Sequence, residues 1–255
     1  MTLESLRDEG IPTDGGDLPQ QDFQTSDTSP IQVYFQSWKK ELLKHIAEAD
    51  VIFGAVAWLT DFDILDALAK KKVLIVVQKE DFLRPDSGPH DRDWRVILQE
   101  KYAALKPYGW HHCMDGCATN LFKNYADLVD EFSGVSYMGG PDETDAVRCV
   151  GNYNSDKHPA FPRMHDKTLI FARLERTEFT DHGTTMGTDV IKPYAVFTGS
   201  ANLTHNATKS FENAVFIESD KIAQAYLYEW QQIFLLSEAL DWRYPWIEPE
   251  YRIGS

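Results

Sequence analysis

The sequence predicts one α/β domain built on a mixed, largely parallel β-sheet with helices on both faces. Two observations support this fold class. Residues 51–57 and 73–77 are continuous apolar runs of strand length, as strands buried on both faces require. Each run follows a segment with apolar residues at helical spacing, and this order favours parallel strands joined by right-handed crossovers. A chain of 255 residues can bury a full core of this kind.

The first two helices are predicted from the spacing of apolar residues. The first carries Phe35, Trp38, Leu42, Ile46 and Ala49. The second begins at Thr60 or Asp61, either of which can cap a helix N-terminus. Its apolar residues are Ile64, Leu65 and Leu68.

The rest of the chain adds further elements and no internal repeat. Helices are expected at 95–105 and 121–132, and strands at 146–150, 165–174, 194–198 and 214–218. The last strand leads into a helix capped by Ser219 or Asp220. That helix is expected to bury Ile222, Tyr226, Trp230, Ile233 and Phe234.

Composition divides the chain into an arm, a domain and a tail. Residues 1–30 are polar and acidic, which indicates a flexible N-terminal arm. Residues 31–240 form the domain, in which 175–193 are predicted to be an inserted hairpin. Residues 241–255 are predicted to pack on the domain as a C-terminal tail, through aromatic side chains such as Trp242 and Trp246.

Charge and hydropathy limit the possible partners and locations. A net charge of −15 argues against a protein that coats nucleic acid by neutralising many phosphates, but not against an enzyme with a small cationic pocket. The sequence shows no signal peptide and no apolar run long enough to cross a bilayer. We therefore expect a cytoplasmic protein without stable membrane association.

Three cysteines, an odd number, do not indicate a disulfide framework. Cys113, Cys117 and Cys149, with a histidine, could hold a structural zinc ion, since thiolate and imidazole are suitable tetrahedral ligands. Their spacing matches no strict zinc template, and buried reduced cysteines are common, so this second interpretation is favoured. No cofactor is predicted.

Two short segments carry the residues that indicate chemistry. His165 and Lys167 are two residues apart in a predicted strand, so their side chains point to the same face. Ser200 and Asn202 follow another apolar strand and can donate hydrogen bonds to an oxyanion. Glu212 precedes the next strand and could hold one histidine tautomer. An imidazole nucleophile with fixed donors suits phosphoryl transfer without a metal.

His165-x-Lys167 followed by Gly199-Ser200-x-Asn202 resembles the HKD signature of the phospholipase D superfamily, particularly its small single-motif bacterial nuclease-like branch. The resemblance covers residues 33–236 and implies a phospholipase D-like fold. It also implies that His165 forms a phosphohistidine and that Lys167, Ser200 and Asn202 bind the phosphate. Glu212 matches the position that orients the histidine. A single motif implies a homodimer whose two motifs meet in one active site.

One position departs from the family pattern. The family usually has aspartate five residues after the lysine, where this chain has Ala172. Asp181 or Asp189, in the inserted hairpin, could substitute for it.

Three functions remain open from the sequence. The first is a nuclease that cleaves DNA or RNA, with Arg148 and Arg163 as candidate substrate-binding residues. The second is a phospholipid-directed hydrolase or transferase, for which an amphipathic membrane-binding helix is expected and none is apparent. The third is a catalytically impaired module that binds nucleic acid or protein. The nuclease is favoured, because the chain is small and has a single motif.

Overall fold

The computed structural model describes residues 29–84, 94–108, 135–137, 145–153, 161–181 and 184–253. Strands are β1 Ile31–Tyr34, β2 Val51–Val56, β3 Lys72–Gln78, β4 Lys106–Pro107, β5 Val135–Tyr137, β6 Val147–Val150, β7 Lys167–Asp181, β8 Thr184–Gly199, β9 Ala214–Glu218 and β10 Tyr251–Ile253. Helices are α2 Trp38–Glu48, α3 Phe62–Leu68, α4 Trp94–Ala103 and α6 Asp220–Leu235, with 3₁₀ turns η1 Asp81–Leu83 and η3 His205–Lys209. The N-terminal arm, the predicted helix at 121–132, Cys113 and Cys117 lie outside these ranges.

The main sheet of the described chain has eight strands and is mixed, as predicted. Its order is β1-β9-β8-β7-β2-β3-β4, and β6 also pairs with β3. The pairs β2–β3, β3–β4 and β3–β6 are parallel, whereas β2–β7, β7–β8, β8–β9 and β9–β1 are antiparallel. Parallel pairing thus covers less of the sheet than predicted, because β7, β8 and β9 follow one another as a meander after the first crossovers.

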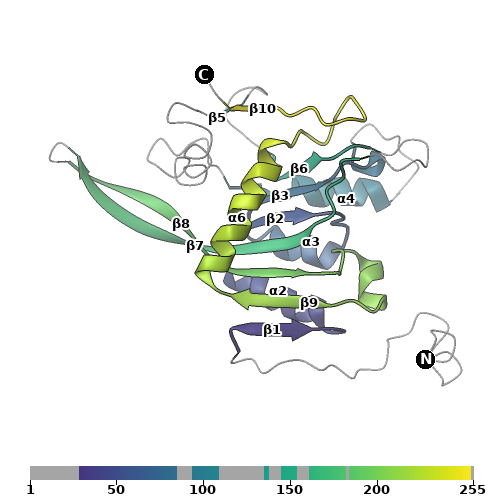
Figure 1. The fold of residues 1–255 in the computed structure, drawn as a ribbon, viewed down its shortest axis with the longest axis horizontal. Helices are drawn as coiled ribbons and strands as arrows, with labels where there is room; N and C mark the ends of the chain where they lie inside the picture. The colour runs from purple at the N-terminus through teal and green to yellow at the C-terminus, as the bar shows by residue number, and fades with distance from the viewer. Residues whose placement is uncertain are drawn as a thin grey trace, which may run out of the picture.

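Helices cover both faces of this sheet, as predicted (Figure 1). Helices α2, α3 and α4 contribute Leu42, Leu65 and Leu98 to one core cluster, and α6 contributes Trp230 and Phe234 to the other. Alternate residues along β2 and β3 enter opposite clusters, as the two-residue period of a strand requires. The sheet is therefore buried on both sides, which explains the continuous apolar runs.

The alternatives for the two helix caps are resolved by side-chain hydrogen bonds. Asp61 caps α3 by accepting from the backbone N–H groups of Asp63 and Ile64 (both 3.1 Å). Ser219 caps α6 by accepting from Ile222 N–H (3.4 Å). The prediction that Ile222 is buried is wrong: it is 37% exposed, because the buried stripe of α6 runs through Ala223 instead.

Two segments add to the sheet and its covering helices: a long hairpin and the C-terminal segment. β7 and β8 continue beyond their neighbours as a long hairpin that projects on the left of Figure 1. Near the C-terminus, residues 241–250 lie against the domain through Lys79, which is fully buried. Its ammonium group pairs with Glu238 and donates to the carbonyls of Tyr244 (3.0 Å) and Trp246 (2.6 Å). Buried charges of this kind require such partners.

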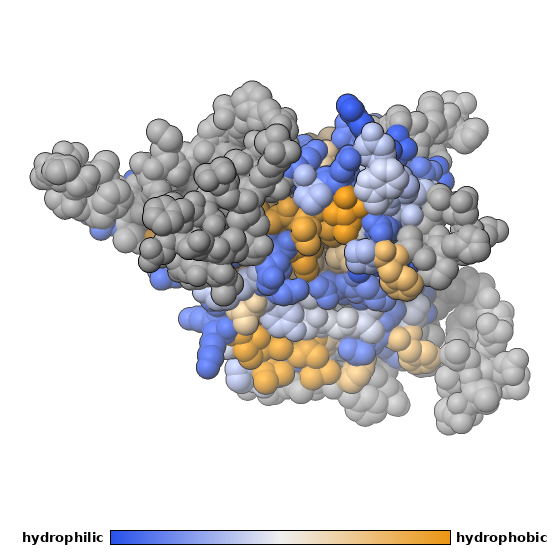
Figure 2. Space-filling view, turned by 45° about the horizontal axis from the view of Figure 1, so that its top comes forward, coloured by the Kyte–Doolittle hydropathy of each residue, from blue (hydrophilic) through white to orange (hydrophobic). Residues whose placement is uncertain are grey.

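The surface combines apolar and polar regions. On the face in Figure 2, hydrophobic residues form separate patches between hydrophilic ones. Among the described residues, no helix has the length and apolar character that crossing a membrane requires.

Candidate active site

The ends of several strands meet at one edge of the sheet, opposite the projecting hairpin (Figure 1). β2 and β8 end there, and β7 and β9 begin there, because β2–β7, β7–β8 and β8–β9 are all antiparallel. The segments that immediately follow or precede these ends carry Trp58, His165, Ser200, Asn202 and Glu212. The topology therefore gathers both halves of the motif at one edge.

His165 and Lys167 lie together at the start of β7. Lys167 Nζ is 3.4 Å from both Nδ1 and Nε2 of His165, and it donates to the His165 carbonyl (2.9 Å). The backbone of this segment is fixed by a hydrogen bond from Ala57 N–H to the Asp166 carbonyl (2.7 Å). The exposed imidazole and the partly buried ammonium group thus face the same space, as the two-residue spacing predicted.

The electrostatics of Lys167 link the two halves of the motif. Burial lowers the pKa of Lys167 below its usual 10.5, and the negative charges of Asp166 and Glu212 act in the opposite direction. Glu212 precedes β9 and is distant in sequence, so its influence on Lys167 is a consequence of the sheet topology. Burial thus favours the neutral form of Lys167, and the carboxylates of Asp166 and Glu212 favour its charged form.

Ser200 is held by three hydrogen bonds between the ends of β8 and β9. Its hydroxyl donates to Glu212 Oε2 (2.5 Å) and accepts from Asn213 N–H (3.0 Å), while its own N–H donates to the Asn213 carbonyl (3.0 Å). Gly199 allows this approach: a Cβ atom there would stand 2.1 Å from the Asn213 oxygen. Any side chain at 199 would separate the strands.

Asn202 has a buried polar atom that has no partner in the described part of the chain. Its Oδ1 is buried and makes no hydrogen bond. A buried polar atom without a partner is uncommon in a folded protein and is available to a ligand. A 180° turn of the amide would present its NH₂ group, a hydrogen-bond donor, in the same place.

Glu212 has a different partner from the one predicted. The sequence predicted that it orients His165, but its described hydrogen bond is to Ser200. In this arrangement the carboxylate fixes the hydroxyl that was predicted to bind phosphate.

The alanine that replaces the family aspartate is remote from this edge. Ala172 is fully buried in the core beneath α6, at an irregularity in the β7–β8 pairing. It lies five residues along the strand from Lys167, or about 16 Å. Asp181 and Asp189, the residues suggested as substitutes for the family aspartate, lie farther along the β7–β8 pairing, in the projecting hairpin.

The two arginines predicted to bind substrate lie in different environments. Arg148 is fully buried in β6, where its guanidinium donates to Ser237 Oγ (2.8 Å) and pairs with Glu250, so the prediction of a substrate-binding role is wrong. It anchors the C-terminal segment instead. Arg163 is exposed, two residues before His165, and pairs with Glu80 (3.0 Å). It stays a candidate substrate-binding residue.

The described residues give no support to a metal site. Within the described ranges, no group of three or more His, Cys, Asp or Glu side chains is arranged to hold a metal ion. Cys149, the predicted ligand that is described, is a buried free cysteine whose thiol donates to the Ala239 carbonyl (3.3 Å). Burial raises the pKa of this thiol, which disfavours the thiolate that zinc requires.

Trp58 also lies at this edge, although it was not among the site residues predicted from the sequence. The Ala57–Asp166 hydrogen bond continues the β2–β7 pairing by one residue beyond Val56 and Lys167, which brings Trp58 to the edge where His165 lies. Its ring is 42% exposed, and its indole N–H donates to Glu80 (3.2 Å). A tryptophan that directly follows a buried strand was the available signal.

Fold and site together define an α/β protein with the paired His-x-Lys and Gly-Ser-x-Asn segments at one sheet edge. The chain belongs to the same family as the uncharacterized protein L381 of Acanthamoeba polyphaga mimivirus. The two are 30% identical over 219 residues, which is 86% of this chain and 69% of the viral protein. No protein-family model matches the sequence.

The solved structures similar to this one include two bacterial proteins. NucT from Helicobacter pylori has a TM-score of 0.44 and 13% identity, covering 82% of this chain and 98% of NucT. Nuc from Salmonella typhimurium, a phospholipase D family member, has a TM-score of 0.41 and 20% identity, covering 82% of this chain and 95% of Nuc.

Proposed function

We propose that this protein is a metal-independent phosphodiesterase, a nuclease that cleaves DNA or RNA through a phosphohistidine intermediate. The observation that carries this proposal is the position of Lys167 Nζ, 3.4 Å from both ring nitrogens of His165 at an exposed sheet edge. An ammonium group at this distance can bind a phosphate oxygen while the imidazole reaches the phosphorus. Ser200 and Asn202 supply further polar groups at the same edge.

The proposed reaction has two displacement steps. In the first, a ring nitrogen of His165 attacks phosphorus, an N–P bond forms, and the P–O bond to one of the two linked nucleotides breaks. In the second, a water oxygen attacks phosphorus and the N–P bond breaks, which leaves a phosphate monoester on the other nucleotide and frees His165. Lys167, Ser200 and Asn202 stabilise charge on the non-bridging oxygens in both steps.

The reaction also needs an acid for the leaving oxygen. The chain has one His-x-Lys motif, and a second copy of the chain can supply the second imidazole. In a homodimer with the two edges facing, the partner subunit's His165 protonates the departing oxygen and then takes a proton from the attacking water. The proposal therefore includes a dimer whose two histidines share one active site.

The test compares wild type with His165→Ala on labelled single-stranded and double-stranded DNA and RNA in the presence of EDTA. Cleavage should survive chelation and fall at least about a thousandfold in the variant. Lys40→Ala, an exposed lysine change on α2, is the control and should cleave like wild type. Alkaline quenching should trap radiolabelled phosphate on wild type but not on His165→Ala.

Two results would contradict the proposal. Cleavage that stops in EDTA would replace the histidine mechanism with a metal-dependent one. A folded wild-type protein that cleaves none of the four nucleic acids would exclude the nuclease, and release of the headgroup alcohol from phospholipid vesicles would then identify a lipid-directed enzyme.

A further inference from the structure

An aromatic groove adjoins the proposed catalytic residues. A cavity of about 400 Å³ is lined by the rings of Trp58, Phe82 and Trp94, and it also contacts Asn202 and Glu212. We define the aromatic groove as this cavity. Because two of its lining residues belong to the site, a molecule with a phosphate at Lys167 would place its neighbouring groups in the groove.

The aromatic rings are accessible and held in place. Trp58 and Trp94 are 42% and 45% exposed, although large aromatic side chains are usually buried. The centroids of the Trp94 and Phe82 rings are 5.3 Å apart, and the Trp58 indole is fixed by its hydrogen bond to Glu80. Exposed rings held in position beside a reactive site are suited to stack on a flat ligand.

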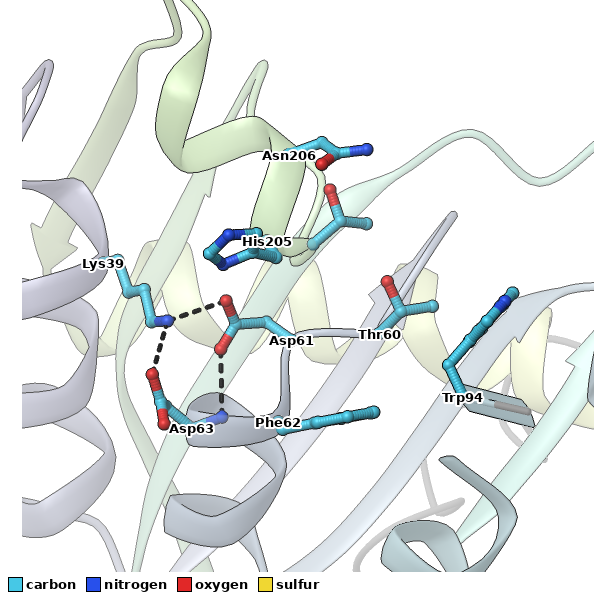
Figure 3. A pocket seen from close by; sticks show the side chains of 9 residues that line it. Lys39, Thr60, Asp61, Phe62, Asp63, Trp94, His205 and Asn206 are labelled. Carbon is cyan, nitrogen blue, oxygen red and sulfur yellow. Dashed lines mark hydrogen bonds and ion pairs between the residues drawn. The ribbon is translucent and has the colours of Figure 1, made fainter. Parts of the chain in front are cut away.

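A second cavity, of about 580 Å³, shares Trp94, Thr60, Thr204 and Asn206 with the first and extends the groove (Figure 3). Figure 3 shows Trp94 on one side of it and Lys39 on the other. Lys39 is paired with Asp61 (2.7 Å) and Asp63 (2.8 Å), so its charge is compensated.

The charges of the groove indicate which part of a nucleic acid it can take. Among the described residues that line the 400 Å³ cavity, none is cationic and Glu212 carries a negative charge. Phosphate groups gain nothing from such walls, whereas uncharged bases can stack on the rings and bond to the Asn202 and Thr204 side chains. An acyl chain would leave Asn202 Oδ1 without a partner, which disfavours a lipid.

We infer that the aromatic groove is a base-stacking subsite and that the enzyme acts on unpaired strands. This inference rests on the proposed function and names its substrate class. In a duplex, the base faces are already stacked on one another, so they cannot reach Trp58 and Trp94. In a single strand, bases next to the scissile phosphate can turn into the groove, with little dependence on base identity.

The test measures binding separately from cleavage. Fluorescence anisotropy is measured in a His165→Ala background with a labelled single-stranded oligonucleotide and with the duplex of the same sequence. Trp58→Ala and Trp94→Ala should each weaken single-strand binding about 5- to 150-fold, the equivalent of about 1–3 kcal/mol of stacking. Duplex binding should change less than about twofold. Trp58→Phe and Trp94→Phe, which keep an aromatic face, should recover most of the affinity.

Salt dependence and a matched control distinguish stacking from charge or misfolding. Ile222→Ala removes an exposed apolar side chain from α6, which covers the other face of the sheet, and should bind like the parent. Trp58→Ala should leave the slope of log affinity against log salt unchanged. Lys167→Ala should reduce it by about 0.7 if this lysine contacts one phosphate of a single strand.

The outcomes separate the groove from the catalytic proposal. If Trp58→Ala and Trp94→Ala bind single strands like the parent, or if duplex binding falls equally, the base-stacking subsite is wrong even when His165 proves catalytic. If the parent binds no single strand at all, the inference is also wrong. Groove-dependent single-strand binding by a protein whose His165→Ala variant cleaves like wild type would instead overturn the catalytic proposal alone.

Discussion

The Ser200 hydroxyl donates a hydrogen bond to Glu212 and accepts one from the Asn213 backbone N–H. A hydroxyl group has a single donor hydrogen, so in this state the donor of Ser200 is directed at a carboxylate rather than at the substrate position. For Ser200 to donate to a phosphate oxygen, its hydroxyl must turn or Glu212 must move.

Ser200→Ala and Glu212→Gln should act on one shared interaction. Each change should lower kcat/KM for cleavage about 10- to 100-fold, and the double variant should lose much less than the product of the two. The measurement is a double-mutant cycle on kcat/KM with circular dichroism as the folding check. Fully multiplicative losses would show that Glu212 acts independently of Ser200, for example on His165 as the sequence suggested.

Lys167 should set an alkaline limit on activity. Its lowered pKa means that it loses its positive charge at a lower pH than the 10.5 of an ordinary lysine. As the pH rises through that pKa, phosphate binding weakens and kcat/KM falls, since this ratio reports the free enzyme. Lys167→Arg should retain the charge and move the limit to higher pH.

The control for this pH profile is Lys40→Arg, on an exposed position of α2. Its profile should coincide with that of wild type. An alkaline limit that stays in place in Lys167→Arg would assign the titration to another group.

Arg148 and Arg163 should differ in what their removal affects. Arg148→Ala leaves Glu250 and Ser237 without their buried partner, and the free energy of unfolding should fall by about 3 kcal/mol. Its kcat/KM should stay within about twofold of wild type at a temperature where the variant is folded. Arg163→Ala, which breaks a partly exposed pair, should cost less than about 1 kcal/mol but raise KM.

Denaturant unfolding and steady-state kinetics on the same preparations check both variants. A folded Arg148→Ala protein with a much higher KM would restore the substrate-binding role. An Arg163→Ala protein with wild-type KM would remove Arg163 from the site.

His45 should make stability depend on pH on the acid side. Its ring stacks on Phe216 (centroids 3.5 Å apart) and lies 3.0 Å from the Tyr34 hydroxyl, and burial lowers its pKa to about 4. As the pH falls from 6.5 to 4, the unfolded chain binds a proton that the folded chain does not. The free energy of unfolding therefore decreases, by about 1–2 kcal/mol after allowance for solvent screening, and above pH 7 the effect is absent.

The measurement is the free energy of unfolding across this range in wild type, His45→Phe and His205→Gln. The pH dependence should be reduced in His45→Phe, which keeps an aromatic ring against Phe216. It should be unchanged in His205→Gln, since His205 is exposed. Equal slopes in all three proteins would show that other groups cause the acid loss of stability.

The elements and the motif were predictable because their signals are local. The apolar runs of β2 and β3 specify buried strands whatever else surrounds them. The two-residue spacing of His165 and Lys167 places both on one side of an extended chain. Asp61 and Ser219 were identified as possible caps from their side-chain chemistry alone.

The sequence by itself thus determined the α/β class, most strand and helix positions and the pairing of imidazole with ammonium. The tertiary structure decided which strands became neighbours, and hence that Ser200 meets Glu212 and that Trp58 lies at the same sheet edge as His165. It also decided that Arg148 is buried while Arg163 is exposed, although both looked like surface cations. The physical reason is that secondary structure follows periodicity within one segment, whereas burial and hydrogen-bond partners depend on segments distant in sequence that only the folded sheet brings together.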